Sequence, residues 1–161
     1  MPNGSHQILL EIPIHNIWLF VRDMNKWAPL VPGYIEHEIL NDQQSTWSFK
    51  GDLGIVKKTV KLKIDITQWQ EPTRVSFDLT GLSDNFSGSG FFKADAVNEH
   101  STMMTGYLDI TAKGAMGPMI NSILKTFVPK TAFELSEAIA AEIIEIEKAG
   151  KDKTTKLYKE S

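Results

Sequence analysis

The most constraining feature of the sequence is a two-residue alternation in its middle. Val60, Leu62, Ile64 and Ile66 alternate with lysine, aspartate and threonine. Successive side chains of a strand point to opposite faces, so this pattern predicts a strand with one buried and one solvated face. The phase slips at Trp69, which indicates a bulge or the strand end.

Six other segments have strand character, with turn signals such as 51–54 between them. The predicted strands are residues 7–14, 34–40, 46–50, 56–67, 75–80, 86–96 and a last one around 104–110. Their even spacing indicates an antiparallel meander. Residues 1–5 are expected to fray. Two short helices follow the first strand, one capped by Asn16 and one over residues 25–30.

The C-terminal third changes to the helical period. Gly117-Pro118 is typical of a helix start, and apolar residues then recur at three- and four-residue intervals. Pro129 should kink or divide this helix, because proline removes a backbone donor. Gly150 fits the position just after the helix end. The Lys-rich residues 151–161 are expected to form a disordered, solvated tail, or alternatively a weak contact with an anionic membrane or partner.

These elements predict an α+β fold in one domain, residues 1–150: a seven-stranded antiparallel sheet wrapped around a long C-terminal helix, with two short helices after the first strand. A twisted sheet seldom closes perfectly on one helix, so an apolar cavity is expected between them. Large aromatic and aliphatic side chains are the candidate ligand-binding residues. They are Trp47, Phe49, Val60, Leu62, Phe77, Phe86, Phe92, Met104, Leu108, Met119, Ile120, Ile123, Leu124 and Phe127.

Methionines are expected at the mouth of this cavity. Met103, Met104, Met116 and Met119 are predicted to gather near the start of the long helix. Methionine adapts its shape and is common on surfaces that accept varied apolar partners.

Composition excludes several classes of protein. The absence of cysteine excludes disulfides, thiolate catalysis and Cys-ligated zinc. A net charge of -3 argues against a general nucleic-acid binder. No apolar run reaches the roughly 18 residues of a membrane span, and no signal-peptide pattern opens the sequence. We therefore expect a cytoplasmic protein, with a peripheral membrane contact as an option.

No motif for metal or phosphate binding is found. The four histidines show no HExxH spacing, and in Glu36-His37-Glu38 neighbouring side chains point to opposite faces. A surface role for His37 is favoured over one as a metal ligand. Ser87-Gly88-Ser89-Gly90 lies within a predicted strand, where a phosphate loop does not occur, and its glycines indicate close approach of a neighbour. No metal or cofactor is expected.

The strand carboxylates offer no obvious acid–base pair. Asp65, Asp78 and Asp109 fall on the polar phase of their strands and are expected to face solvent. A raised carboxyl pKa needs burial, which that phase does not supply. Catalysis is therefore disfavoured, although catalytic groups need only meet in space.

An ordered series of short motifs resembles the helix-grip superfamily (START-like, Bet v 1-like, polyketide cyclase-like), and within it the CoxG-like group, which is named after a component of carbon monoxide dehydrogenase. The series covers residues 7 to 147. It consists of Ile17-Trp18, Asp23, Pro32-Gly33, Leu53-Gly54-Ile55, Glu71-Pro72-Thr73-Arg74, Ser87-Gly88-Ser89-Gly90, Gly114, Gly117, Phe133 and Leu135. Pro118, Pro129 and the Lys-rich tail depart from the group's pattern.

The resemblance implies a cavity for a lipid-like or other hydrophobic small molecule. For the CoxG-like group it also implies association with a membrane-linked redox enzyme, through quinone or lipid. The wider superfamily includes carriers, sensors, cyclases and chaperone activators, so the fold does not select one function.

The sequence is compatible with three candidate functions. The favoured one is non-catalytic binding of a hydrophobic, lipid- or quinone-like molecule between sheet and helix. Its closest rival is an interaction or maturation module for a partner enzyme, which predicts an exposed apolar patch. The third is a cyclase or hydrolase, which predicts a polar pair with perturbed pKa values inside the cavity.

Overall fold

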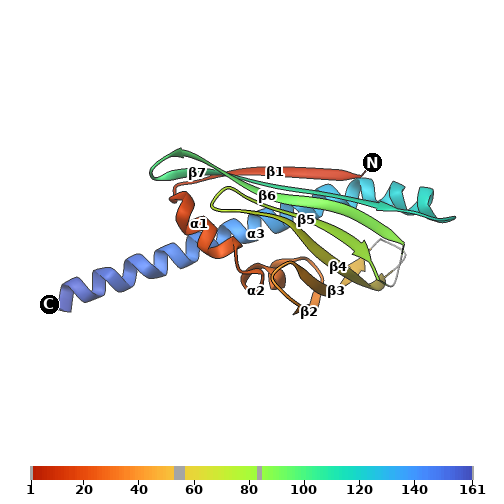
Figure 1. Cartoon of the computed structure of the whole chain (residues 1–161). Coiled ribbons are helices and arrows are strands. Elements are labelled where there is room, and N and C mark those ends of the chain that lie inside the picture. The colour runs from red at the N-terminus through yellow and green to blue at the C-terminus, as the bar shows by residue number, and fades with distance from the viewer. Residues whose placement is uncertain (1, 53–56, 83–84, 161) are drawn as a thin grey trace.

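The computed structural model describes residues 2–52, 57–82 and 85–160, and in residues 52, 57, 58 and 151–160 only the backbone. The turn predicted at Leu53-Gly54-Ile55 lies outside the described residues. One curved sheet forms one layer of the molecule, and a long helix runs along it (Figure 1).

All seven strands belong to a single antiparallel sheet, as predicted. They are β1 (Asn3–Leu10), β2 (Tyr34–Ile39), β3 (Gln44–Asp52), β4 (Lys57–Gln70), β5 (Arg74–Gly81), β6 (Phe86–Asn98) and β7 (Ser101–Ala112). Their order in the sheet is β1-β7-β6-β5-β4-β3-β2, so only β1 leaves the sequential meander to pair with β7. The register of β4 on β5 shifts between Ile66 and Gln68, which confirms the bulge predicted near Trp69.

The N-terminal predictions were wrong in detail. β1 begins at Asn3, so residues 3–5 do not fray, and it ends at Leu10 rather than at residue 14. Pairing supplies the reason, because Asn3 lies opposite Asp109 and each following residue has a partner on β7. Ladder hydrogen bonds hold this polar edge segment where side-chain burial alone would not.

Two short helices follow β1 and differ from the predictions mainly at their caps. Helix α1 spans Ile14–Val21 and has Pro13, not Asn16, at its N-cap. Asn16 instead donates from Nδ2 to Glu147 at 3.0 Å. Helix α2 (Met24–Trp27) is capped by Asp23, and a 3-10 turn, Ala28–Leu30, follows because Pro29 cannot continue an α-helix.

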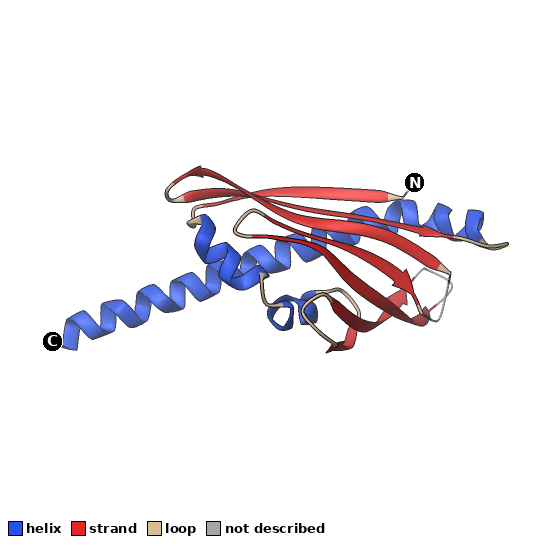
Figure 2. Cartoon of the chain, in the orientation of Figure 1, coloured by secondary structure: helices blue, strands red, loops and turns tan. Residues whose placement is uncertain are grey.

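The C-terminal helix α3 spans Gly117–Glu160 without a break. Pro129 lies inside it and does not divide it, since packing of the helix on the sheet can offset both the lost hydrogen bond and the clash of the proline ring with the preceding turn. The helix also continues through Gly150, which has no positive φ of the kind that caps a helix. The predicted helix end was therefore wrong, because one glycine costs only about 1 kcal/mol within good helix formers. Figure 2 shows α3 passing along the sheet and extending beyond it at the C-terminus.

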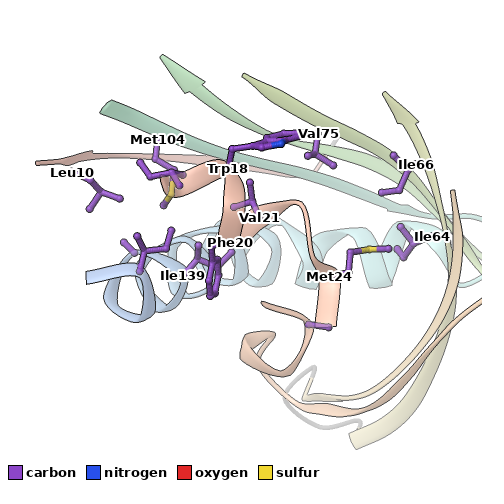
Figure 3. Packing of buried hydrophobic residues seen from close by; sticks show 14 of the residues in the cluster. Leu10, Trp18, Phe20, Val21, Met24, Ile64, Ile66, Val75, Met104 and Ile139 are labelled. Carbon is purple, nitrogen blue, oxygen red and sulfur yellow. The ribbon is translucent and has the colours of Figure 1, made fainter. Parts of the chain in front are cut away.

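The hydrophobic core lies between the sheet, α1 and α3. Its buried side chains alternate along the strands, as the two-residue period predicted, and Leu62, Ile64 and Ile66 are at most 6% exposed. Figure 3 shows Trp18 of α1 extending towards Val75 of β5, within this interior. The core thus joins both helical segments to one face of the sheet.

Asp109 corrects the expectation for the strand carboxylates. It is only 7% exposed, although it lies on the polar phase of β7. Ser89, directly opposite on β6, donates to it from both its backbone nitrogen (3.2 Å) and its hydroxyl (2.8 Å). Neighbouring side chains on the outer face cover the carboxylate, which alternation along a single strand cannot reveal. Asp65 is partly exposed and Asp78 is exposed.

Candidate functional site

A groove remains between the sheet and α3 because the helix does not lie over the middle of the sheet. It packs mainly against β1 and β7, at one edge. The inner face of β3 to β6 is therefore only partly covered. Trp27, Val31 and Pro32, from α2 and the segment after the 3-10 turn, close the opposite side.

Three small apolar pockets lie along this groove. Their volumes are about 70, 90 and 50 Å³. The first and second share Phe77, Leu108 and Leu135, and the second and third share Phe49 and Phe127, among others. Each is smaller than the roughly 300 Å³ at which ordinary ligand sites begin, so a larger ligand would span several of them.

Most of the predicted binding residues line these pockets. They are Trp47, Phe49, Val60, Leu62, Phe77, Phe86, Phe92, Met104, Leu108, Leu124 and Phe127. Gly90 leaves room for one of them, since a Cβ there would lie 2.4 Å from Phe77 Cζ. The glycines of this strand thus permit the close approach that the sequence indicated.

Met119, Ile120 and Ile123 do not line any of the three pockets. Met119 is 54% exposed, and Met116, three residues earlier, is 56% exposed. The predicted methionine cluster is also wrong, because Met104 lies at the other end of β7, opposite Ile8. The start of α3 therefore adds no lining residue before Leu124.

The sequence-based prediction missed most of the part of α3 that faces the pockets. Phe127, Thr131, Leu135 and Ile139 recur every four residues and form one stripe along the helix. That spacing is readable in the sequence, but apolar residues at the helix start follow the same period and do not line the site. Trp27 was also missed, and a short helix gives no periodic signal for which side chain points inwards.

The described lining of the three pockets carries no Asp, Glu, Lys, Arg or His. Its side-chain polar groups belong to Trp27, Trp47, Tyr107, Thr131 and Ser136. An apolar site without charge binds by removing apolar surface from water and cannot hold an isolated ion without a large desolvation cost. Among the described residues there is also no group of three acidic or histidine side chains that could hold a metal ion.

His37, predicted as a surface residue, is partly exposed at the edge of the sheet and forms hydrogen bonds through both ring nitrogens. Its Nδ1 lies 2.6 Å from the Tyr34 hydroxyl, and its Nε2 lies 2.7 Å from Asn25 Oδ1. Its ring also lies 5.8 Å from that of Trp47. Both ring nitrogens are thus occupied by neutral partners that position the β2 edge against α2.

A row of aromatic and polar side chains crosses the outer face of the sheet. Phe91 stacks on Tyr107 at 5.0 Å, and the Arg74 guanidinium lies 4.2 Å from the Phe91 ring centre. Burial raises the pKa of the Tyr107 phenol, and its hydrogen bond to Asp109 and the charge of that carboxylate raise it further. This row stabilises the pairing of β5, β6 and β7.

A wider, open cleft of about 470 Å³ lies outside the groove. It is bordered by Trp18, Arg22 and Asp23 in and after α1, by Trp69 of β4, and by Asp42 in the connection between β2 and β3. The edge of one tryptophan ring faces the other at 6.3 Å, and Trp69 Nε1 donates to the Asp42 carbonyl. These contacts join the two sides of the cleft to each other.

None of the helices, as far as they are described, combines the length and the hydropathy that crossing a bilayer requires.

Comparisons with known proteins identify the fold of the chain. A protein-family model, described only as "-like", matches residues 1–147. No curated protein matches the chain. A START superfamily protein from Mycobacterium smegmatis is 18% identical, with a TM-score of 0.70 over 89% of this chain and 98% of that one.

Two further solved structures are similar. The ZhuI aromatase/cyclase from Streptomyces sp. R1128 is 15% identical, with a TM-score of 0.69 over 88% of this chain and 92% of that chain. A norcoclaurine synthase mutant from Thalictrum flavum is 13% identical, with a TM-score of 0.65 over 90% and 95%. At such identities the likeness shows the fold and not the activity. The chain therefore belongs to the family whose model covers residues 1–147, and its fold is the START-like helix-grip fold.

Proposed function

We propose that the chain binds a hydrophobic small molecule, without catalysing a reaction, in the groove between the sheet and α3. The observation that carries this proposal is the run of three adjoining pockets whose described lining is apolar and uncharged. Each 100 Å² of apolar surface removed from water contributes roughly 2.5 kcal/mol before the costs of association. Filling such a run supplies affinity without any charged contact.

A ligand longer than one pocket must displace the side chains between them. Phe77, Leu108 and Leu135 line both of the first two pockets, and Phe49 and Phe127 line both the second and the third, so these side chains lie where the pockets adjoin. Aromatic and leucine side chains turn about χ1 and χ2 without breaking a hydrogen bond. We propose that this rearrangement admits a lipid- or quinone-like molecule, in keeping with the resemblance to the CoxG-like group.

The test uses two phenylalanines of the same helix. Phe127 lines two pockets, whereas Phe133 is 50% exposed and lines none of them. With 2-acetylnaphthalene as the probe in equilibrium dialysis, Phe127→Asp should abolish binding and Phe133→Asp should retain it. Phe127→Trp, which keeps the site apolar but fills it, is the second variant should Phe127→Asp fail to fold. Binding unchanged in folded Phe127→Asp, or in Phe127→Trp, would refute the site.

A second candidate is an interaction or maturation module for a partner enzyme, which we propose to be a membrane-linked redox enzyme in the cytoplasm. It is favoured by Met116 and Met119, which expose more than half of their surface at the start of α3. An organic extract of the protein purified from its own cells separates the two candidates by mass spectrometry. One stoichiometric hydrophobic compound supports ligand binding, and an empty extract supports the partner module.

A further inference from the structure

The polar groups of the groove are almost all engaged within the protein. Trp27 Nε1 donates to the Val21 carbonyl at 3.0 Å, and Trp47 Nε1 donates to the Ser45 hydroxyl at 2.8 Å. Thr131 donates its hydroxyl proton to the Phe127 carbonyl at 2.9 Å. These three donors are therefore not available to a ligand.

Tyr107 also borders the first pocket, but its phenol lies on the outer face of the sheet and is engaged there. Its hydroxyl forms a hydrogen bond with Asp109, and the buried carboxylate accepts only, so the phenol supplies the proton. The same bond contributes to the raised pKa of Tyr107.

Ser136 is the exception. It lines the first pocket and is only 5% exposed, yet within the described part of the chain its hydroxyl has no hydrogen-bond partner. A serine in a helix commonly bonds the carbonyl four residues earlier, as Thr131 does here, so an unengaged hydroxyl on a largely buried helix residue is unusual. Buried hydroxyls without a partner are costly, which makes a ligand group that accepts this proton favourable.

The strand opposite Ser136 carries a glycine where it meets the hydroxyl. Ser136 faces Gly106 of β7, where a Cβ would lie 2.4 Å from the serine Oγ. Gly106 itself lines the same pocket. The absence of a side chain at Gly106 lets the hydroxyl lie close against the strand, and both residues border the first pocket together with Met104 and Leu108.

We infer that Ser136 is the polar anchor of the site, and that the ligand is an uncharged hydrophobic molecule with a carbonyl or hydroxyl oxygen that accepts the Ser136 proton. This inference rests on the proposed function. Charge on the ligand is excluded by the uncharged lining, since an unpaired ion in an apolar pocket carries a large desolvation cost. The oxygen lies in the first pocket and the apolar body extends towards the second.

Two probes of similar size test the anchor. 2-Acetylnaphthalene and 2-ethylnaphthalene differ in one carbonyl, which only accepts hydrogen bonds. The ratio of their dissociation constants measures the contribution of that oxygen, and Ser136→Ala removes the proposed donor. A net hydrogen bond is worth about a factor of five to ten, so we expect this variant to shift the ratio by that factor against the acetyl compound. Alanine suits a buried helix position, so the variant should fold.

Thr131→Val is the matched control, because the Thr131 hydroxyl lines the second pocket but has already donated its proton. The ratio should stay as in the wild type. The infrared stretch of the bound carbonyl gives a second readout, with a shift to lower frequency that Ser136→Ala removes and Thr131→Val retains.

The outcomes distinguish a failure of the Ser136 anchor from a failure of the proposed function. If both probes bind and the ratio is the same in wild type and Ser136→Ala, the anchor is refuted while hydrophobic binding stands. If neither probe binds the wild type, the proposed function is refuted and the anchor with it.

Discussion

Helix α3 comes close to the sheet at two glycines, and they give a sharp test of how the helix packs on the sheet. A Cβ on Gly4 of β1 would lie 2.4 Å from Pro129 Cα and 3.1 Å from its nitrogen. A Cβ on Gly106 of β7 would meet only Ser136 Oγ at 2.4 Å, with the next atom at 3.7 Å. Backbone atoms cannot yield without moving the helix, whereas a hydroxyl can rotate.

The magnitudes follow from this difference. Overpacking a close contact usually costs about 1–3 kcal/mol, and we expect Gly4→Ala to fall near the upper end because the obstacle is backbone. In Gly106→Ala the serine leaves its preferred rotamer at roughly 0.5–1.5 kcal/mol. Replacing a strand glycine by alanine stabilises the folded state by about 0.5–1 kcal/mol, so the net change in the free energy of unfolding should stay within about 1 kcal/mol.

Urea unfolding followed by tryptophan fluorescence measures both variants. We expect Gly4→Ala to lower the urea concentration at the unfolding midpoint clearly and Gly106→Ala to change it little, with unchanged m-values in both. The double variant Gly106→Ala with Ser136→Ala should recover the wild-type midpoint, because the serine Cβ already lies at an ordinary contact distance. A Gly4→Ala protein as stable as the wild type would show that α3 does not rest on β1 at Pro129.

Three further predictions concern stability. Met104 is 1% exposed in the core, and its replacement by alanine should lower the free energy of unfolding by about 2–5 kcal/mol, as measured by calorimetry. A loss below about 1 kcal/mol would argue against tight packing of Met104. Asn16→Ala should cost about 1 kcal/mol in urea unfolding, because its bond to Glu147 joins α1 to α3; Glu147→Gln, which retains the acceptor, should cost less. The folded protein holds the Tyr107 proton more tightly than the unfolded chain, because the pKa of Tyr107 is raised on folding. The resulting contribution to stability is complete below the ordinary pKa of 10.0 and is lost as pH rises above it. Tyr107→Phe should therefore flatten the fall in stability at alkaline pH, and an equal fall in both proteins would contradict the raised pKa.

Periodicity predicted the fold well because most strands here bury one face. The alternation at Leu62, Ile64 and Ile66 fixes which side of β4 is buried, and the later helical spacing identifies α3. Segments whose structure depends on partners were not predictable in the same way. The start of β1 at Asn3 depends on pairing with β7, and continuation of α3 through Gly150 depends on its neighbours in the helix.

The candidate site was most predictable residue by residue where a strand carried it, and on α3 only Leu124 and Phe127 of the predicted residues line a pocket. Strand alternation placed Phe77 and Leu108 on the pocket side, and the structure has them there. Ser136 could not be found from sequence, since nothing in a helical pattern shows which hydroxyl is left without a partner. The burial of Asp109 was equally hidden, because it arises from Ser89 on a neighbouring strand.

The central claim is that the groove, and not an outer surface, receives the hydrophobic molecule. Methyl NMR during titration with 2-acetylnaphthalene tests it most directly. Leu62, Leu108 and Leu135 line the pockets, whereas Leu9 and Leu82 are each 55% exposed and line none of them. We predict saturable shifts and probe contacts at the three pocket leucines, with the two exposed leucines unchanged. Shifts confined to the exposed leucines, with the pocket leucines unmoved, would contradict the account.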